Sequence, residues 1–368
     1  MDFSLNEMQQ MLSDSIARYV SREGASARDF SPARWKQFAE MGLLGLTVSE
    51  SLGGSGGSAV DAACVMEQLG RGCVRTPYAF SAVYASSLLG DLGDAAQQDR
   101  WLTALASGEA MFACAVYEVE ARHDLLPLAA RAERQGDGFV LSGHKSNVWY
   151  AQHASHVIVA ARTEGVAGDA QGLSLFVLPT DAPQLVWRHF PTVDGGCASE
   201  LTLNKVVATA AQVLGPVGDA HAALSTAERR TTAALAAESV GLSTVMLDMT
   251  VEYARTRQQF GQAIGASQAL QHRMVDMLIE VEQARSLAWF AATSVDEGDA
   301  VAQTRAVSAA KARTGAAGSR VGKDAIQLHG GMGMTDELLL SQYVKRQMAV
   351  EQTLGDTAFH VERFARID

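Results

Sequence analysis

The sequence predicts an α+β protein in which a helical N-terminal region, a middle β region and a C-terminal four-helix bundle follow one another. Apolar residues recur at helical spacing toward both ends of the chain. Between about residues 111 and 215 this spacing gives way to short β-branched or Leu-rich runs bounded by Gly, Pro and Asp. The 368 residues exceed the usual size of one hydrophobic core, so two or three packed units are expected.

The first region, residues 1–110, is predicted to be helical. The stretch FSPARWKQFAEMGLLGL has apolar residues at helical spacing, and Ser31 followed by Pro32 is a typical N-cap and first helical residue. A second such segment, SAVDAACVMEQLGRG, follows the glycine-rich break GGSGG at 53–57, which we interpret as a loop.

The middle region, residues 111–215, is predicted to form a compact β unit, a barrel or a sandwich. The segment AARAERQGDGFVLSGHKS has the pattern of two strands around a Gln-Gly-Asp-Gly turn. Three further runs have the composition of strands: HVIVAAR, LSLFVLP and ELTLNKVVA.

The last region, residues 216–368, is predicted to form a four-helix bundle. Helical periodicity extends over 219–258, 267–297, 300–328 and 335–366. It is interrupted near FGQAIG, DEGD, HGGMG and LGD. Four such segments joined by short turns are typical of a bundle.

The composition excludes several classes of protein. A net charge of −11 argues against a nucleic-acid binder, which needs a broad basic face. We expect no membrane span, because no run of eighteen apolar residues occurs, and no secretory signal at the start MDFSLNEMQQ. The four cysteines and the histidines lack metal-ligand spacing, so we expect no metal site and a cytoplasmic chain with reduced thiols.

The stretch YARTRQQFGQAIGASQALQHRMVDM, residues 253–277, joins the first two predicted bundle helices. Arg255 and Arg257 near a helix C-terminus can simply complement the helix dipole. Alternatively, a guanidinium there can grip a phosphate bidentately while Phe260 covers a ring. The residues alone leave both interpretations open.

The stretch QLHGGMGMT, residues 327–335, ends the third predicted bundle helix. Its three glycines expose backbone N–H groups that can line an anion-binding concavity. A plain C-terminal cap between two helices is the alternative, and a lone glycine-rich turn does not distinguish them.

Together, these two motifs resemble those of the acyl-CoA dehydrogenase family. RTRQQFG is similar to the family's Arg-x-x-Phe-Gly element, and QLHGGMGM to its Gln-x-x-Gly-Gly-x-Gly element. EMGLLGL, GDGFVLSGHK and KRQMAVEQTLGDTAFH are further matches, so the resemblance covers essentially the whole chain. Within the family, the fragments EARHDL, AAESVG, SQALQHRMVDML and LGDTAFH resemble the pimeloyl-CoA dehydrogenase small-subunit-like branch.

The resemblance implies an enzyme that binds FAD non-covalently between the β region and the bundle and introduces an α,β double bond into an acyl-CoA. A carboxylate would remove the α-proton while the β-hydrogen leaves as hydride to flavin N5. The implied acceptor is an electron-transfer flavoprotein. The implied cofactor residues are Arg257, Gln259 and Phe260 toward a neighbouring subunit's FAD, Gln327, Gly330 and Gly331 by the pyrophosphate, and Thr357 near the adenosine half.

The same resemblance implies an oligomer, because Arg257 would serve a neighbour's cofactor. We expect a homodimer or homotetramer, or a heterotetramer with a homologous subunit. The branch likeness suggests dicarboxyl, aromatic or otherwise bulky acyl groups.

The catalytic base is predicted among two carboxylates, because neither position that the family uses holds one here. Those positions correspond to Gly355 and Thr231. Glu238 lies seven residues after Thr231 in the apolar run TAALAAESVGLSTVML, and apolar surroundings suit a base. Asp356 is adjacent to Gly355 but has a shorter reach. We favour Glu238; the alternatives are a buried glutamate hydrogen-bonded across the bundle and, for Asp356, a cap or turn residue.

The chain also departs from the family in the β region. YEVEARHD replaces a Thr-Glu-Pro element, so Tyr117 or a neighbour stands where a small hydroxyl residue contacts the flavin. Asn147 and Trp149 occur near the usual Trp-x-Thr, and Trp149 is either a flavin contact or an apolar strand residue. These changes leave open a non-catalytic subunit that completes the FAD site of a homologous partner. A flavin-dependent oxidase or monooxygenase is the third alternative.

Overall fold

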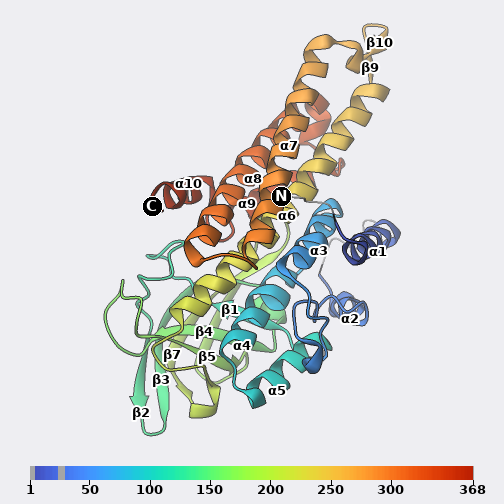
Figure 1. Cartoon of the computed structure of the whole chain (residues 1–368). Coiled ribbons are helices and arrows are strands. Elements are labelled where there is room, and N and C mark those ends of the chain that lie inside the picture. Colours follow the sequence, from blue (N-terminus) through green and yellow to red (C-terminus); the bar gives the residue numbers. More distant parts are fainter. Residues whose placement is uncertain (1–4, 24–29, 368) are drawn as a thin grey trace. The chain divides into compact units, whose positions relative to one another are not determined.

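The helix–β–helix order is confirmed in a computed structural model, which describes residues 5–23 and 30–367 (Figure 1). Residues group into two compact units, each interrupted in sequence. Of the described residues, the helical unit comprises 5–23, 59–75 and 232–367, and the β-containing unit comprises 30–58 and 76–231. Helix α6 therefore begins in the β-containing unit and continues in the helical unit. The division at residues 110 and 215 stays a prediction.

The elements of each unit have the following bounds. Those of the β-containing unit are α2 Pro32–Glu40, α4 Ser86–Leu92, α5 Ala95–Ala106, β1 Phe112–Ala115, β2 Arg131–Gln135, β3 Gly138–Trp149, β4 His156–Arg162, β5 Leu173–Pro179, β6 Leu185–Pro191, β7 Cys197–Ala208 and β8 Val213–Leu214. The remaining helices and the short hairpin are α1 Glu7–Glu23, α3 Ala59–Arg71, α6 His221–Thr256, β9 Gln258–Gln259, β10 Gln262–Ala263, α7 Gln268–Ser294, α8 Ala300–His329, α9 Leu340–Gln352 and α10 Thr357–Ala365.

The β-containing unit is built on one sheet of eight strands in the order β6-β7-β3-β2-β4-β5-β8, with β1 parallel to β4. The predicted hairpin in AARAERQGDGFVLSGHKS is confirmed: β2 and β3 pair from Gln135 opposite Gly138. Gly136 adopts a φ of +60° in the turn between them, a conformation that costs glycine little. The three other predicted runs form β4, β5 and most of β7.

A buried ion pair fixes the segment that follows β1. Lys145 Nζ on β3 donates to Glu118 Oε1 at 2.6 Å, and both side chains are buried. The Glu118 carboxylate also accepts from the backbone N–H groups of Ala129 and Ala130. Since Tyr117 directly precedes Glu118, its backbone is held in place as well, and Ser146 N–H donates to its carbonyl at 2.9 Å.

The predicted start of α2 is confirmed. Ser31 is the N-cap, its Oγ accepts from Arg34 N–H at 3.2 Å, and Pro32 is the first helical residue. This arrangement satisfies one of the amide groups that a helix start leaves unpaired.

In the helical unit, α7 and α8 run side by side, and the β9–β10 hairpin connects α6 to α7 (Figure 1). A core of mostly alanine and valine side chains lets these helices approach closely. The bundle segment 335–366, predicted with an interruption near LGD, forms two helices, α9 and α10. Leu354 and Gly355 adopt positive φ values in the LGD turn, which separates α9 from α10.

Helix α6 is also more apolar than expected from the absence of a long apolar run. An 18-residue window of α6 has a mean hydropathy of 1.3, and 72% of that window is buried inside the protein. A core helix of a globular protein has the same length and composition.

Candidate active site

Glu238 lies on α6 and is 1% exposed, as the apolar run around it predicts. Its carboxylate is bound by Arg346 of α9: Nε donates to Oε1 at 2.6 Å and a terminal nitrogen donates to Oε2 at 3.0 Å. The prediction of wholly apolar surroundings is therefore wrong, because a guanidinium from 108 residues later in the chain contacts both oxygens. This geometry is that of a glutamate bonded across the bundle, the alternative considered from the sequence.

Neighbouring residues reinforce this contact between α6 and α9. Gln347 Nε2 donates to Ser239 Oγ at 2.8 Å, directly beside the Glu238–Arg346 pair. On the other side, α3 approaches α6 so closely that a Cβ at Gly70 would overlap the carbonyl oxygen of Glu238. The α6 backbone at Glu238 is thus fixed from two sides, and a carboxylate here has little room to move.

Asp356 is the N-cap of α10, with Oδ1 accepting from Phe359 N–H at 2.8 Å. Beside it, Gly355 has a φ of +105°, and a Cβ there would lie 2.5 Å from the Phe359 ring and 2.7 Å from His360 Nε2. A larger side chain at Gly355 would overlap both of these rings and would adopt a strained φ. The structure therefore gives a local reason why this turn contains glycine.

A buried lysine donates hydrogen bonds to the backbone at the same turn. Lys311 Nζ on α8 donates to the carbonyls of Glu351 and Gly355 at 2.8 and 2.7 Å. Burial lowers the pKa of Lys311 to about 8, and the nearby charges of Glu351 and Asp356 only partly oppose this shift.

The RTRQQFG motif forms the end of α6 and the β9–β10 hairpin. Phe260 and Gly261 are the two turn residues, with φ of +52° and +80°. Positive φ at both positions is typical of a type I′ turn, and for a phenylalanine it is strained by about 1–3 kcal/mol. The Phe260 ring is fully exposed at 102%, and Arg257 and Gln259 are exposed as well. A strained, exposed aromatic ring at a hairpin tip is typical of a contact with something outside the chain.

The QLHGGMG motif ends α8 at the same end of the helical unit. His329 is buried and stacks on Tyr253 of α6, with ring centroids 4.4 Å apart. This contact brings the RTRQQFG and QLHGGMG motifs together, although 74 residues separate Tyr253 from Gln327. Gln327, Gly330 and Gly331 are exposed, and a Cβ at either glycine would meet open space. Their backbone is accessible to an anion.

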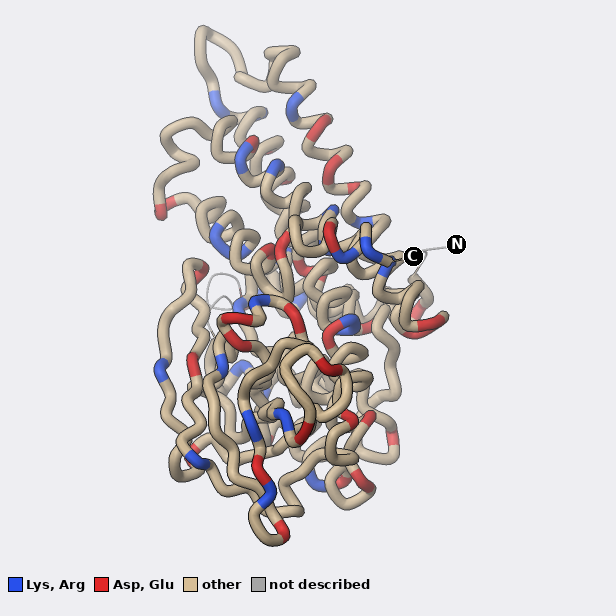
Figure 2. Tube along the Cα trace, turned by 90° about the vertical axis from the view of Figure 1, so that its left-hand side faces the viewer, with Lys and Arg blue, Asp and Glu red and all other residues tan. Residues whose placement is uncertain are grey.

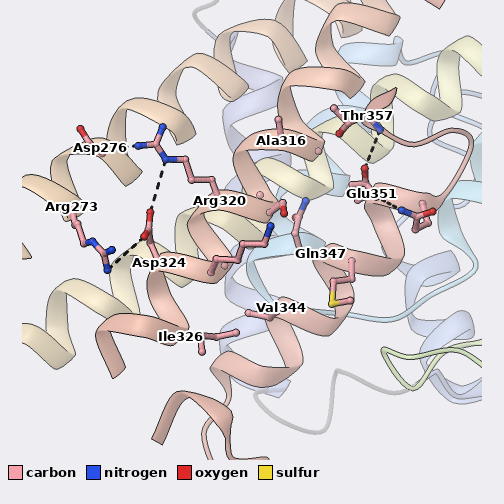
Figure 3. Close-up of a pocket in the computed structure, with 17 residues that line it drawn as sticks. Arg273, Asp276, Ala316, Arg320, Asp324, Ile326, Val344, Gln347, Glu351 and Thr357 are labelled. Carbon is pink, nitrogen blue, oxygen red and sulfur yellow. Dashed lines mark hydrogen bonds and ion pairs between the residues drawn. The ribbon is translucent and has the colours of Figure 1, made fainter. Parts of the chain in front are cut away.

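Thr357 lines a groove of about 920 Å³ between α8 and α9 (Figure 3). Its floor contains small residues of α8, including Gly315, Gly318 and Gly322. The rim carries ion pairs, among them Arg320–Asp276 at 3.5 Å and Arg273–Asp324 at 3.9 Å. Basic and acidic positions are similarly interspersed along the helices elsewhere (Figure 2).

Trp149 lies at the end of β3 in the β-containing unit. One face of its indole stacks on Phe80, with ring centroids 4.3 Å apart and an interplanar angle of 9°. The Tyr117 ring lies edge-on to the indole, with ring centroids 6.4 Å apart. The Trp149 side chain remains partly exposed. Trp149 therefore has both a packing role and an accessible surface.

The sequence analysis missed Glu228. This residue of α6 is 2% exposed, and its Oε2 accepts from the Tyr117 hydroxyl at 2.6 Å. Glu228 belongs to the charged run ERR, and such runs typically lie on a solvent-exposed helix face. Its burial was therefore not predicted. The available signal was its spacing, since Glu228 precedes Thr231 by less than one helical turn.

These residues fit an FAD in chemical terms. Exposed glycine N–H groups at the end of α8 and the Arg257 guanidinium suit a pyrophosphate. Phe260 and the open part of Trp149 offer aromatic surface to a ring.

Comparisons with known proteins indicate one and the same family along nearly the whole chain. Three family models match: acyl-CoA dehydrogenase, N-terminal domain, over residues 6–109; middle domain, over 113–206; and C-terminal domain, over 220–367. The chain belongs to the acyl-CoA dehydrogenase family. The resemblance inferred from the two motifs and the predicted fold class are therefore confirmed, and family membership is consistent with FAD-dependent acyl-CoA dehydrogenation.

Individual relatives cover nearly the full length of this acyl-CoA dehydrogenase. A probable acyl-CoA dehydrogenase of Bacillus subtilis, YngJ, is 30% identical, covering 99% of this chain and 98% of its own. The FAD complex of PigA has a TM-score of 0.89 at 28% identity, covering 100% and 98%. A chain of the ChsE4-ChsE5 complex from Mycobacterium tuberculosis has a TM-score of 0.87 at 28% identity, covering 100% and 98%.

Proposed function

We propose that this chain is an FAD-dependent dehydrogenase that introduces an α,β double bond into an acyl-CoA thioester. The observation that carries the proposal is the stacking of Tyr253 on His329, which places the exposed RTRQQFG and QLHGGMG motifs at one end of the helical unit. The full-length family match supports the same activity. It does not favour the alternative of a non-catalytic subunit.

In this proposal the chain's own residues hold the cofactor. Gln327, Gly330 and Gly331 would bind the pyrophosphate, Thr357 would contact the adenosine half, and Trp149 would face the ring system. The hairpin residues Arg257, Gln259 and Phe260 would contact the FAD of a neighbouring subunit. The exposure of their side chains supports this role. When bound, FAD supplies the two-electron acceptor that receives the β-hydrogen as hydride.

The chain must also supply a base for the α-proton. The α C–H bond of a thioester is a weak acid, so its proton goes to a carboxylate held at the α-carbon in a water-poor site. Glu238 and Asp356 stay the predictions from the sequence. The contacts of both side chains count against them: Arg346 binds both oxygens of Glu238, and Asp356 caps α10 with one of its own.

We further propose that the enzyme works as an oligomer. An exposed Phe260 that serves a neighbour's cofactor requires at least a dimer, and the resemblance to the ChsE4-ChsE5 complex also supports a heterotetramer with a homologous subunit. An electron-transfer flavoprotein is the proposed acceptor, and dicarboxyl, aromatic or bulky acyl-CoAs are the proposed substrates. The four cysteines, all among the described residues, are buried and form no disulfide, which supports a reducing compartment such as the cytoplasm.

The test is reduction of bound flavin by a thioester. The purified protein would be titrated without oxygen with pimeloyl-CoA, octanoyl-CoA and phenylpropionyl-CoA while its visible spectrum is recorded. Bleaching by one of them, followed by slow reoxidation in air, supports a dehydrogenase. Rapid reoxidation would instead indicate an oxidase or monooxygenase.

A further inference from the structure

The β-containing unit contains a buried carboxylate, Glu228, that is not among the proposed cofactor-binding residues. It lies in the first third of α6 and is 2% exposed. Burying a carboxylate is costly unless it is bonded or has a function. Its position is informative, because residues three apart on a helix share a face, and the family resemblance implies a base at the position of Thr231.

The contact of Glu228 with Tyr117 connects α6 to the end of β1. The Tyr117 hydroxyl donates to Oε2 at 2.6 Å, a short hydrogen bond of the charge-assisted kind. Tyr117 in turn lies edge-on to Trp149. Both residues occupy places where the family resemblance puts flavin contacts. Glu228 is thus a buried carboxylate bonded directly to a residue that the family resemblance places beside the flavin.

Two phenols and an imidazole lie within electrostatic range of Glu228. Burial raises the pKa of Tyr117 and of Tyr84 well above the usual range, and the Glu228 charge adds to both shifts. Burial lowers the pKa of His221, although Glu228 and Asp124 oppose that shift. Arg229 follows Glu228 in the sequence and lowers the pKa of His221 further. The two phenols therefore stay protonated at neutral pH and can donate hydrogen bonds.

We propose that Glu228 is the catalytic base, and that Tyr117 positions its carboxylate. The assignment rests on the proposed function. The α C–H bond breaks, the proton is bound by Glu228, and the electron pair forms the C=C bond as the β-hydrogen leaves with its electron pair to the FAD. The Tyr117 hydroxyl bonds one oxygen of Glu228, Oε2, whereas the guanidinium of Arg346 bonds both oxygens of Glu238.

The test is exchange of the α-hydrogen of an acyl-CoA in D₂O, followed by ¹H NMR without an electron acceptor. The probe is whichever of pimeloyl-CoA, octanoyl-CoA or phenylpropionyl-CoA bleaches the wild type. Glu228→Gln keeps an oxygen for the Tyr117 hydroxyl, and should keep its flavin and an acyl-CoA affinity by calorimetry within about threefold. Its exchange rate should fall by about 10²–10⁴-fold, the range for loss of a general base. Glu238→Gln and Asp356→Asn test the two other candidates, and neither should lose exchange by this factor while its flavin is retained. Glu252→Gln, at an exposed glutamate of the same helix, is the control and should exchange at the wild-type rate.

Tyr117→Phe separates a positioning role from a structural one and serves if Glu228→Gln does not fold. Loss of the hydroxyl removes a stabiliser of the charged carboxylate, so the acid limb of the pH profile of exchange should move to higher pH. A merely structural hydrogen bond would lower the unfolding temperature and leave the profile in place.

Two results overturn the assignment. If Glu228→Gln exchanges at the wild-type rate, or Glu238→Gln loses exchange instead, Glu228 is not the base although the proposed function stands. If the wild type holds flavin but is neither bleached nor active in exchange, the proposed function fails and this assignment fails with it.

Discussion

The carboxylate of Glu238 and the guanidinium of Arg346 form a bidentate ion pair across the helical unit, at 2.6 and 3.0 Å. The pair explains why a single charged residue occurs in the run TAALAAESVGLSTVML. Its counter-charge comes from α9, where KRQMAVEQ supplies it on the face that packs inward. A carboxylate so bonded connects α6 to α9, and its loss is expected to affect stability first.

Arg346→Met should destabilise the protein by about 3–5 kcal/mol, because it leaves Glu238 as a buried charge without its guanidinium. The double variant Glu238→Leu/Arg346→Met removes both charges and should lose less than the single variant. Urea unfolding followed by circular dichroism measures both. A single variant as stable as the wild type would show that the pair contributes nothing.

Gly70→Ala and Gly241→Ala should each cost about 1–3 kcal/mol or more through overpacking. A Cβ at Gly70 would overlap Glu238 O, and one at Gly241 would overlap Glu67 O, because α3 and α6 approach closely there. Gly90 in α4 is the matched control, since a Cβ there meets nothing within 4 Å. Gly90→Ala should be neutral or stabilising by about 0.5–1 kcal/mol. Equal thermal shifts for all three would contradict the close approach.

Phe260→Ala should weaken flavin retention without changing the unfolding temperature. The ring is fully exposed, so its removal costs the chain no packing, while loss of an aromatic contact is worth about 1 kcal/mol, or roughly fivefold in affinity. Flavin content after gel filtration and a dilution series measures the effect. Gln258→Ala on the same hairpin is the control and should retain flavin like the wild type. Equal retention by the two variants would remove Phe260 from the cofactor site.

Lys311 should make stability rise with pH above about pH 8. Its pKa in the folded protein is lowered to about 8 from 10.5, so between these values the unfolded chain binds more protons than the folded one. The free energy of unfolding of the wild type, relative to Lys311→Met, should therefore increase by up to about 3 kcal/mol across this window. Below pH 8 the difference should be flat. A difference that stays flat up to pH 10.5 would show that the lysine is not perturbed.

The fold could be predicted because its signals are local. The alternation in AARAERQGDGFVLSGHKS defined a hairpin, Ser31-Pro32 defined a helix start, and the two motifs defined the family. The interruption at LGD was also predicted from the sequence, whereas the hydrogen bond that Lys311 donates to this turn from a distant part of the chain was not.

The candidate site was harder to predict because its decisive contacts are long-range. Arg346 is 108 residues from Glu238, and Tyr117 is 111 residues from Glu228. An apolar run shows that a carboxylate is buried but not what binds it, and a charged run such as ERR hides one that is buried. Burial of Glu238 followed from the sequence; its partner, and the existence of the Glu228–Tyr117 pair, did not.

The central claim is that this chain, in its native oligomer, holds FAD and passes electrons from an acyl-CoA to it. The most direct measurement is the visible spectrum of the purified protein during anaerobic addition of pimeloyl-CoA, octanoyl-CoA or phenylpropionyl-CoA. The account predicts a flavin spectrum that bleaches with at least one thioester, together with mass-spectrometric detection of the matching enoyl-CoA. A protein that holds flavin but stays oxidised with every thioester, or that holds none in its native assembly, would contradict the account.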